Sequence, residues 1–247
     1  MAETFALLLL AHVLADFVLQ PDRMAQAKAG GHGGWMTAHV IVVGVTAALL
    51  LGVQTWQALG VIAALTAAHL VIDMAKLVVA SRVSGIAAFV ADQAAHLVTL
   101  GIVVTFAPQL WAQGLWAAHT PLWLPAAATV VAGAVLATRA GGFALGLLMR
   151  PWGEVGLDGL PGGGRIIGML ERGIIFLLIL AGEPGGIGFL IAAKSVLRFG
   201  AVKEEARLSE YVIIGTLASF GWAMLVAIGT VMLLSALPPL GIPDLSP

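Results

Sequence analysis

The chain contains no cysteine, and its charged residues are scarce. Without cysteine it can form no disulfide bond and can offer no thiolate to a metal ion. Only 10% of its 247 residues are charged, whereas ordinary soluble domains have roughly 25%. The formal net charge of −1 indicates no particular partner, and we expect no nucleic-acid partner. This composition excludes an ordinary soluble domain.

Long apolar runs predict an all-α, polytopic membrane protein. Hydrophobic residues make up 60% of the chain, and a helix needs about 20 apolar residues to cross a bilayer. The runs predict about eight transmembrane helices, at 2–19, 36–53, 57–80, 85–106, 122–149, 167–182, 185–200 and 209–236. We expect one integral membrane domain in contact with the lipid bilayer, with four helices within 1–109 and four more within 110–247.

Among the predicted loops and the helix ends beside them, lysine and arginine occur at alternate loops only. They occur in or beside the loops at 20–35, 81–84, 150–166 and 198–208, but not at 54–56, 107–121 or 183–184, nor at either terminus. Cytoplasmic loops of membrane proteins are enriched in Lys and Arg. The pattern therefore predicts a multi-pass protein of the bacterial inner membrane with both termini outside.

Polar residues recur at a fixed offset of 57 residues. Ala11, His12 and Asp16 recur as Ala68, His69 and Asp73, and Ala38, His39 and Gly44 recur as Ala95, His96 and Gly101. Histidine is rare here, with six residues in the chain, so chance does not explain these matches well. They indicate a parallel internal repeat in which the first helix pair is duplicated as the second.

Three histidine–aspartate pairs are spaced four residues apart, which places each pair on one face of a helix. The pairs are His12–Asp16, His69–Asp73 and Asp92–His96. The third pair is reversed in order and lies on a helix predicted to run the opposite way. All three histidines should therefore lie deeper in the membrane, and all three aspartates should lie nearer the cytoplasm. His39 lies near the cytoplasmic end of its predicted helix and should be close to the aspartates.

This cluster predicts a metal site, because imidazole and carboxylate together suit Zn²⁺ first, and also Mn²⁺ or Fe²⁺. The candidate ligands are His12, Asp16, His39, His69, Asp73, Asp92 and His96. Seven candidates exceed one tetrahedral shell, so either two metals bind or some residues orient the ligands. The alternative is a buried hydrogen-bond network that holds the helices together. We expect Lys76 to extend to the cytoplasmic interface instead of binding the cluster.

A second group of charged residues lies toward the cytoplasmic ends of the later helices. Lys194 and Arg198 share a helix face and should repel unless an acidic group, Glu171 or Glu210, lies near them. Cationic side chains are the usual partners of phosphate and carboxylate. The predicted substrate-binding residues, for an anionic small molecule or lipid headgroup, are Arg172, Lys194, Ser195 and Arg198. A salt-bridge network is the alternative.

Three stretches resemble a family of bacterial inner-membrane proteins catalogued as domain of unknown function 3307. They are residues 12–20, residues 92–96, and residues 188–199 followed by Glu210 and Tyr211. The resemblance implies a membrane location and no established chemistry. The His-x-x-x-Asp helices are also similar to those of membrane-bound metal-dependent hydrolases.

Three functions compete on this sequence. A metal-dependent hydrolase would activate water at the metal and hold an anionic phosphoester or lipid headgroup beside it, with Asp92 or Glu171 as general base. A metal-ion or proton-coupled transporter would use the same residues, but the outer halves of the helices offer few polar groups for a path. A non-catalytic assembly or regulatory subunit would use them structurally. Of the three functions, we expect the metal-dependent hydrolase.

Overall fold

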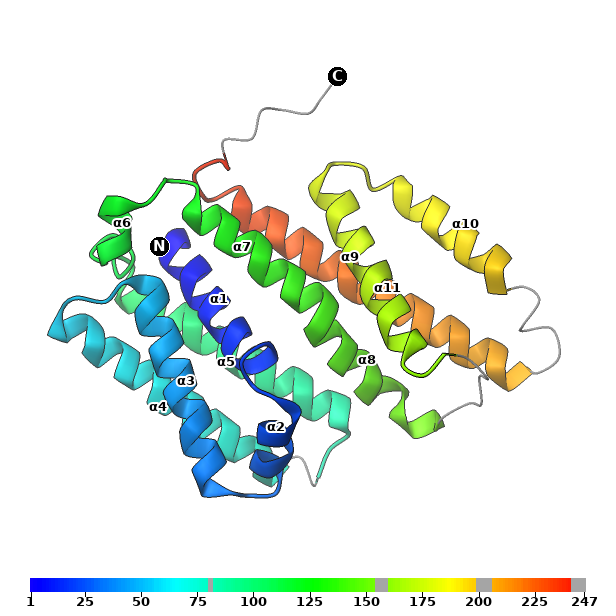
Figure 1. Ribbon diagram of the computed structural model, residues 1–247, viewed down its shortest axis with the longest axis horizontal. Helices are drawn as coiled ribbons and strands as arrows, with labels where there is room; N and C mark the ends of the chain where they lie inside the picture. Colours follow the sequence, from blue (N-terminus) through cyan, green and yellow to red (C-terminus); the bar gives the residue numbers. More distant parts are fainter. Residues whose placement is uncertain (80–81, 154–159, 199–205, 241–247) are drawn as a thin grey trace. The chain divides into compact units, whose positions relative to one another are not determined.

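The computed structural model describes residues 1–79, 82–153, 160–198 and 206–240, and the regular elements among them are all helical (Figure 1). The elements are α1 (Ala2–Phe17), α2 (Asp22–Ala29), α3 (Gly33–Leu51), α4 (Trp56–Val79), α5 (Gly85–Phe106), α6 (Leu115–His119), α7 (Leu124–Val135), the π-helix η1 (Leu136–Ala140), α8 (Gly141–Met149), the 3₁₀-helix η2 (Arg150–Trp152), α9 (Gly163–Leu180), α10 (Gly186–Arg198) and α11 (Ala206–Leu234). An all-α fold is confirmed.

Helices occur near all eight predicted ranges, but fewer are suited to crossing a membrane. Among the described residues, five spans are long and apolar enough: Gly33–Leu51, Trp56–Val79, Gly85–Phe106, Leu124–Trp152 and Ser209–Leu234. The pair α1 and α2, bent by 83°, is a possible sixth. Eight crossings are not confirmed. With 13 residues, α10 is about 20 Å long, too short for a hydrocarbon core of about 30 Å, and α9 carries three charged residues.

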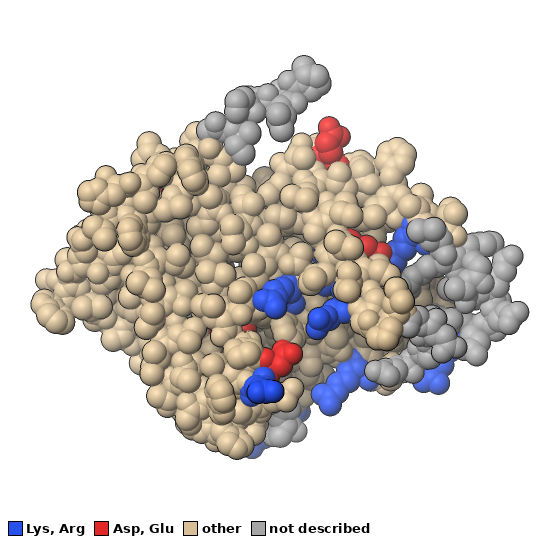
Figure 2. Space-filling view, in the orientation of Figure 1, with Lys and Arg blue, Asp and Glu red and all other residues tan. Residues whose placement is uncertain are grey.

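The surface of the molecule agrees with a lipid environment. On the face drawn in Figure 2, charged side chains occupy a small part of the area. Large apolar side chains such as Leu49, Val71 and Leu225 are more than half exposed. Apolar helices that expose such side chains are at home in a bilayer, so the chain is a multi-pass membrane protein by length and composition.

The chain divides into two compact units, Met1–Ala132 with Met232–Pro247 (unit 1) and Gly133–Val231 (unit 2). The sequence predicted a division at 109/110. Residues 107–121 stay with unit 1 because they bond to its helices: Thr4 Oγ1 donates to Pro108 O at 2.7 Å, and Trp116 Nε1 donates to Leu49 O at 2.6 Å. Gly52 ends α3 with φ of +61°, and a Cβ there would lie 2.7 Å from the Trp116 ring.

Unit 1 is built on a ring of four helices, in which α1 packs against α3 and α5, α3 against α4, and α4 against α5. Each of α3, α4 and α5 buries one stripe of side chains spaced three or four residues apart, as expected for helices with one inward face. The stripes are His39, Val43, Ala47 and Leu51; Ala58, Ile62, Leu65, His69 and Asp73; and Ala88, Phe89, Asp92, His96, Leu100 and Val104. Each stripe is polar at one end and apolar along the rest.

The segment 20–35 was predicted as a loop, yet it contains the helix α2. Pro21 stands at the N-cap of α2, where a residue without an amide proton is tolerated but cannot continue the preceding helix. The chain therefore turns sharply between α1 and α2. Only Met24 and Lys28 of α2 are buried, and α2 packs on α3. This short helix carries Lys28 into unit 1.

Unit 2 is organised around an interrupted helix. The predicted helix 122–149 is divided by η1, and three carbonyl groups at the interruption accept hydrogen bonds from side chains of α9 and α11. A small apolar core lies beside it, formed by Ile175, Ile187, Phe220 and Ala223. Side-chain donors of this kind are what allow a π-helical turn to persist in lipid.

Candidate functional site

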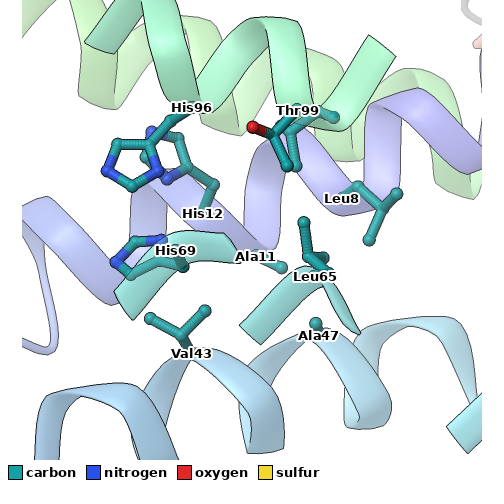
Figure 3. Close-up of a pocket in the computed structure, with 10 residues that line it drawn as sticks. Leu8, Ala11, His12, Val43, Ala47, Leu65, His69, His96 and Thr99 are labelled. Carbon is teal, nitrogen blue, oxygen red and sulfur yellow. The ribbon is translucent and has the colours of Figure 1, made fainter. Parts of the chain in front are cut away.

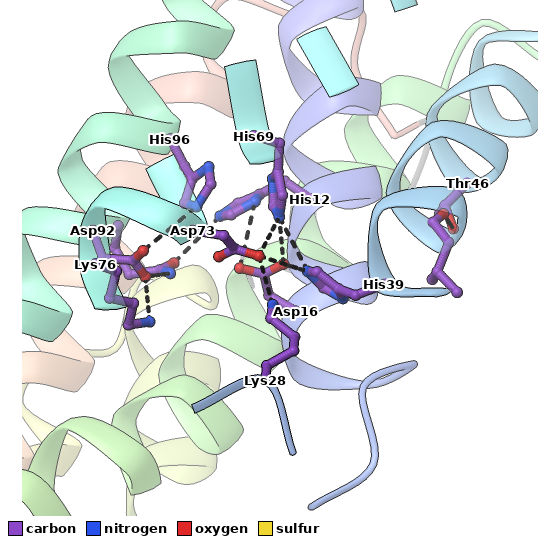
Figure 4. A network of polar contacts seen from close by, with 12 residues as sticks. His12, Asp16, Lys28, His39, Thr46, His69, Asp73, Lys76, Asp92 and His96 are labelled. Carbon is purple, nitrogen blue, oxygen red and sulfur yellow. Dashed lines mark hydrogen bonds and ion pairs between the residues drawn. The ribbon is translucent and has the colours of Figure 1, made fainter. Parts of the chain in front are cut away.

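The seven predicted metal ligands lie together in unit 1 (Figure 4). They come from α1, α3, α4 and α5, and all are buried except Asp16, whose side chain is 11% exposed. The imidazole rings of His12 and His69 both lie against the ring of His96, with centroids 4.9 Å and 4.1 Å from it. The four-residue spacing on each helix thus brings the histidines and aspartates into one cluster.

The centre of the cluster is a triangle of potential ligand atoms. His39 Nε2 lies 3.1 Å from His69 Nε2, and Asp16 Oδ1 lies 3.3 Å from His39 Nε2 and 3.6 Å from His69 Nε2. A tetrahedral shell with metal–ligand bonds of about 2.0–2.2 Å has ligand atoms about 3.3–3.6 Å apart. The two edges from Asp16 lie in this range and the His39–His69 edge is slightly shorter, so the triangle is close in size to one face of such a shell.

Two atoms of the residues that form this triangle have no hydrogen-bond partner among the described residues, and the first of them is a corner of the triangle. They are Asp16 Oδ1 and His39 Nδ1, both buried. A buried carboxylate oxygen without a donor is costly, and a bound cation would relieve that cost.

Gln93 determines which nitrogen of His12 carries a proton. The Gln93 amide donates through Nε2 to Asp92 Oδ2 at 3.1 Å, so its Oε1 faces His12 Nε2 at 3.3 Å and accepts from it. In a neutral imidazole the other nitrogen, Nδ1, is then an acceptor. His12 Nδ1 lies 3.9 Å from Asp16 Oδ2. Two acceptors facing each other favour a cation, either a proton or a metal ion, near this side of Asp16.

Two lysines also enter the cluster. Lys28 Nζ donates to Asp73 Oδ2 at 2.6 Å, and Lys76 Nζ donates to Asp92 Oδ2 at 2.7 Å. The prediction that Lys76 avoids the cluster is wrong, because its ammonium group bonds to Asp92 while the side chain stays 39% exposed. Only Asp16, of the three aspartates, has no lysine contact among the described residues.

Two cavities adjoin the cluster. The first, of about 10 Å³, lies beside His12, His69 and His96 and is otherwise lined mainly by apolar side chains (Figure 3); it has room for about one water molecule. The second, of about 130 Å³, is lined by residues of α4 and α5 that include Lys76 and Asp92. Asp92 is therefore reachable from a cavity large enough for several waters.

The predicted substrate-binding residues belong to unit 2, and those whose side chains are described already have protein partners. Lys194 Nζ donates to Glu171 Oε2 at 2.8 Å, which agrees with the expectation that an acidic group lies near it. Ser195 Oγ donates to Ile191 O. The side chain of Arg198 lies outside the described part of the structure.

Arg172 is bound to the π-helix. Its Nε donates to Ala137 O and its Nη2 to Thr138 O, each at 2.9 Å, and its Nη1 donates to Ser219 Oγ at 3.2 Å. Three of its five N–H groups are therefore used to satisfy groups in unit 2. This arrangement indicates that Arg172 stabilises the interrupted helix.

Residues 4–121 match the family model described as a protein of unknown function, DUF3307. The chain resembles this family. The matched residues include α1 to α5 and every member of the His/Asp cluster. The resemblance expected for residues 188–211 lies outside the match. No curated protein and no solved structure matches the chain.

Sequence reasoning missed Lys28 and Gln93 as members of the cluster. Gln93 follows Asp92 directly and offered a signal, since a glutamine inside an apolar helix needs a partner. Lys28 offered none, because it lies in a polar segment without helical periodicity that packs on unit 1 only in the folded chain.

Proposed function

We propose that unit 1 binds a divalent transition metal ion, Zn²⁺ first and Mn²⁺ or Fe²⁺ as alternatives. The triangle of His39 Nε2, His69 Nε2 and Asp16 Oδ1 carries this proposal, because its three edges of 3.1, 3.3 and 3.6 Å are close to those of one face of a tetrahedral shell. Three protein ligands would leave the fourth position for water or substrate, as in catalytic zinc sites.

With this ion the chain would act as a membrane-embedded, metal-dependent hydrolase at the cytoplasmic face. Its substrate would be anionic, a phosphoester or a lipid headgroup, and the ion would activate water and polarise the substrate oxygen. Asp92 is the better candidate for the general base, because it belongs to the His/Asp cluster of unit 1, whereas Glu171 belongs to unit 2. Each carboxylate is paired with a lysine, but Asp92 Oδ1 has no hydrogen-bond partner among the described residues. Lys76, half-exposed at the 130 Å³ cavity, would attract the anion.

The geometry also supports the parallel repeat. The 57-residue offset exchanges the pair His39–His69 with the pair His96–His12, and the ring centroids of these pairs are 5.1 Å and 4.9 Å apart. Similar distances are expected if the two helix pairs are related by a rotation. The symmetry would be approximate, because the His69–His96 ring contact of 4.1 Å has no equivalent between His12 and His39 among the described residues.

The proposed orientation keeps both termini outside. If α1 and α2 form one span, the chain crosses the membrane six times, and both termini lie on the same side as they would with eight crossings. The helices α9 and α10 would then enter and leave on the cytoplasmic side, between the basic segments 150–166 and 198–208. Eight crossings would require α10 to cross despite its length.

Metal analysis tests the proposal directly. Protein purified without chelator should contain one zinc ion per chain, and His39→Ala and His69→Ala should lose it. His119→Ala is the matched control, because His119 is exposed and lies outside the cluster. A wild-type protein that holds no metal and takes up none on titration with Zn²⁺, Mn²⁺ or Fe²⁺ would overturn the proposal.

The ion pairs Lys28–Asp73 and Lys76–Asp92 favour a second candidate, a non-catalytic assembly subunit. Both pairs join different helical segments at short distances, as a purely structural network would. This candidate predicts a folded, stable protein without metal. A transporter is less favoured, because the cavity on the apolar side of the histidines holds only about 10 Å³.

A further inference from the structure

A second set of potential ligands lies beside the first. One ligand atom from each of Asp73, Asp92 and His96 falls within 4.8 Å of the others, and all three residues are buried. Asp92 Oδ1 and His96 Nε2 are 3.6 Å apart, again the edge length of a tetrahedral shell. Neither atom has a hydrogen-bond partner among the described residues.

This second set differs from the first because lysines contact its carboxylates. Lys76, whose side chain is 39% exposed, lies 2.7 Å from Asp92 Oδ2, and the buried lysine of the set is Lys28. Lys28 Nζ lies 2.6 Å from Asp73 Oδ2, and the residue is only 8% exposed. Asp16, which the internal repeat matches to Asp73, forms its ion-pair contacts in the described part of the chain with histidines alone. Lys28 itself has no equivalent, since Gly85 stands 57 residues later.

We propose that Lys28 is an internal cation that closes the second ligand set, Asp73, Asp92 and His96, so that the chain holds one metal ion instead of two. The proposal rests on the metal site proposed above. In this proposal α2 places Lys28 in the cluster. The two ligand sets then differ in function: the first binds the metal ion, and the ammonium group of Lys28 takes the place of an ion in the second.

The charges of the cluster agree with a single ion. Asp16, Asp73 and Asp92 contribute three negative charges, and Lys28 and Lys76 contribute two positive charges, which leaves one negative charge when the histidines are neutral. One divalent ion with a bound hydroxide brings the total to zero. A second divalent ion would leave uncompensated positive charge inside the membrane, which is strongly unfavourable.

The test compares three substitutions in α2 by metal-to-protein ratio after saturation with Zn²⁺ and removal of the excess. Lys28→Gln removes the ammonium group and should raise the ratio from one ion to two, the number in two-metal sites. Lys28→Arg keeps a cation and should hold one ion. Arg23→Gln, an exposed position on the same helix, controls for the loss of a positive charge and should also hold one.

A ratio of one for folded Lys28→Gln would overturn the inference while leaving the metal site standing. A wild-type protein that binds no metal would instead remove the site itself, and the inference with it. If the variant fails to fold, electron paramagnetic resonance is measured on the wild type after saturation with Mn²⁺ and removal of the unbound ion. The spectrum of one isolated ion supports the inference, and that of a spin-coupled pair contradicts it.

Discussion

The replacement Asp16→Asn isolates the central ligand of the proposed metal site. Asparagine has nearly the same shape but no negative charge, and Asp16 Oδ1 accepts no hydrogen bond among the described residues. Loss of a residue that merely orients a ligand weakens metal affinity by about 10–100-fold. Loss of a direct ligand should exceed that, so we expect at least a hundredfold weaker binding, about 2.7 kcal/mol.

Thermal unfolding in detergent measures this difference. A ligand at a hundred times its Kd stabilises the folded state by about 2.7 kcal/mol. For a chain of this length that corresponds to about 5–11 °C in Tm. Zinc should therefore raise the Tm of the wild type by that amount, and a chelator should reverse the rise. At the same zinc concentration, Asp16→Asn would be at about its own Kd or below, so it should gain at most about 0.4 kcal/mol, a shift of less than about 2 °C.

Asp22→Asn is the matched control, because Asp22 is exposed on α2 and should leave the zinc-dependent shift intact. Two results would refute the reasoning. One is a wild-type Tm that zinc and chelator leave unchanged. The other is a zinc shift of equal size in Asp16→Asn, which would show that the ion binds elsewhere.

Three further predictions follow from the geometry. Arg172→Met should lower the free energy of unfolding by about 2 kcal/mol, from three hydrogen bonds of about 0.6 kcal/mol each in a membrane, with metal content unchanged; Arg165→Met is its exposed control, and an equal loss in both variants would contradict the role of Arg172. Asp92→Asn should lower phosphate release from phosphomonoesters by about 10²–10⁴-fold, the contribution of a general base, and unaltered release would exclude Asp92 as the base. In this cysteine-free chain, Leu115→Cys should react with an impermeant maleimide from outside intact cells and Val83→Cys only after lysis, whereas the opposite pattern would invert the proposed orientation.

Local pattern in the sequence was sufficient for the helices and for the membership of the His/Asp cluster. Apolar runs interrupted by a polar residue every third or fourth position place His69 and Asp73 on the buried stripe of α4, because helix periodicity acts within one turn. The same holds for Asp92 and His96 on α5. Four helices with such stripes can bury them only by facing one another, so the cluster follows from pattern alone.

The partners within the cluster depended on tertiary contacts between residues far apart in the chain. Lys28 and Asp73 are 45 residues apart, and His12 and Gln93 are 81 apart. The periodicity of one segment does not predict which side chain from a distant segment will form a hydrogen bond with it. The lysine or histidine partner of each carboxylate is therefore found only in the folded chain.

Contacts between distant residues also explain why unit 2 differs from the prediction made from its sequence. Hydropathy predicted one continuous helix through Arg139, since a π-helical turn changes the backbone hydrogen bonds without changing composition. That turn persists because Arg172 and Trp222 reach its carbonyl groups from α9 and α11. Composition determined that the chain is helical and lies in a membrane, whereas packing between helices decided where a helix is interrupted and which charged groups are already satisfied.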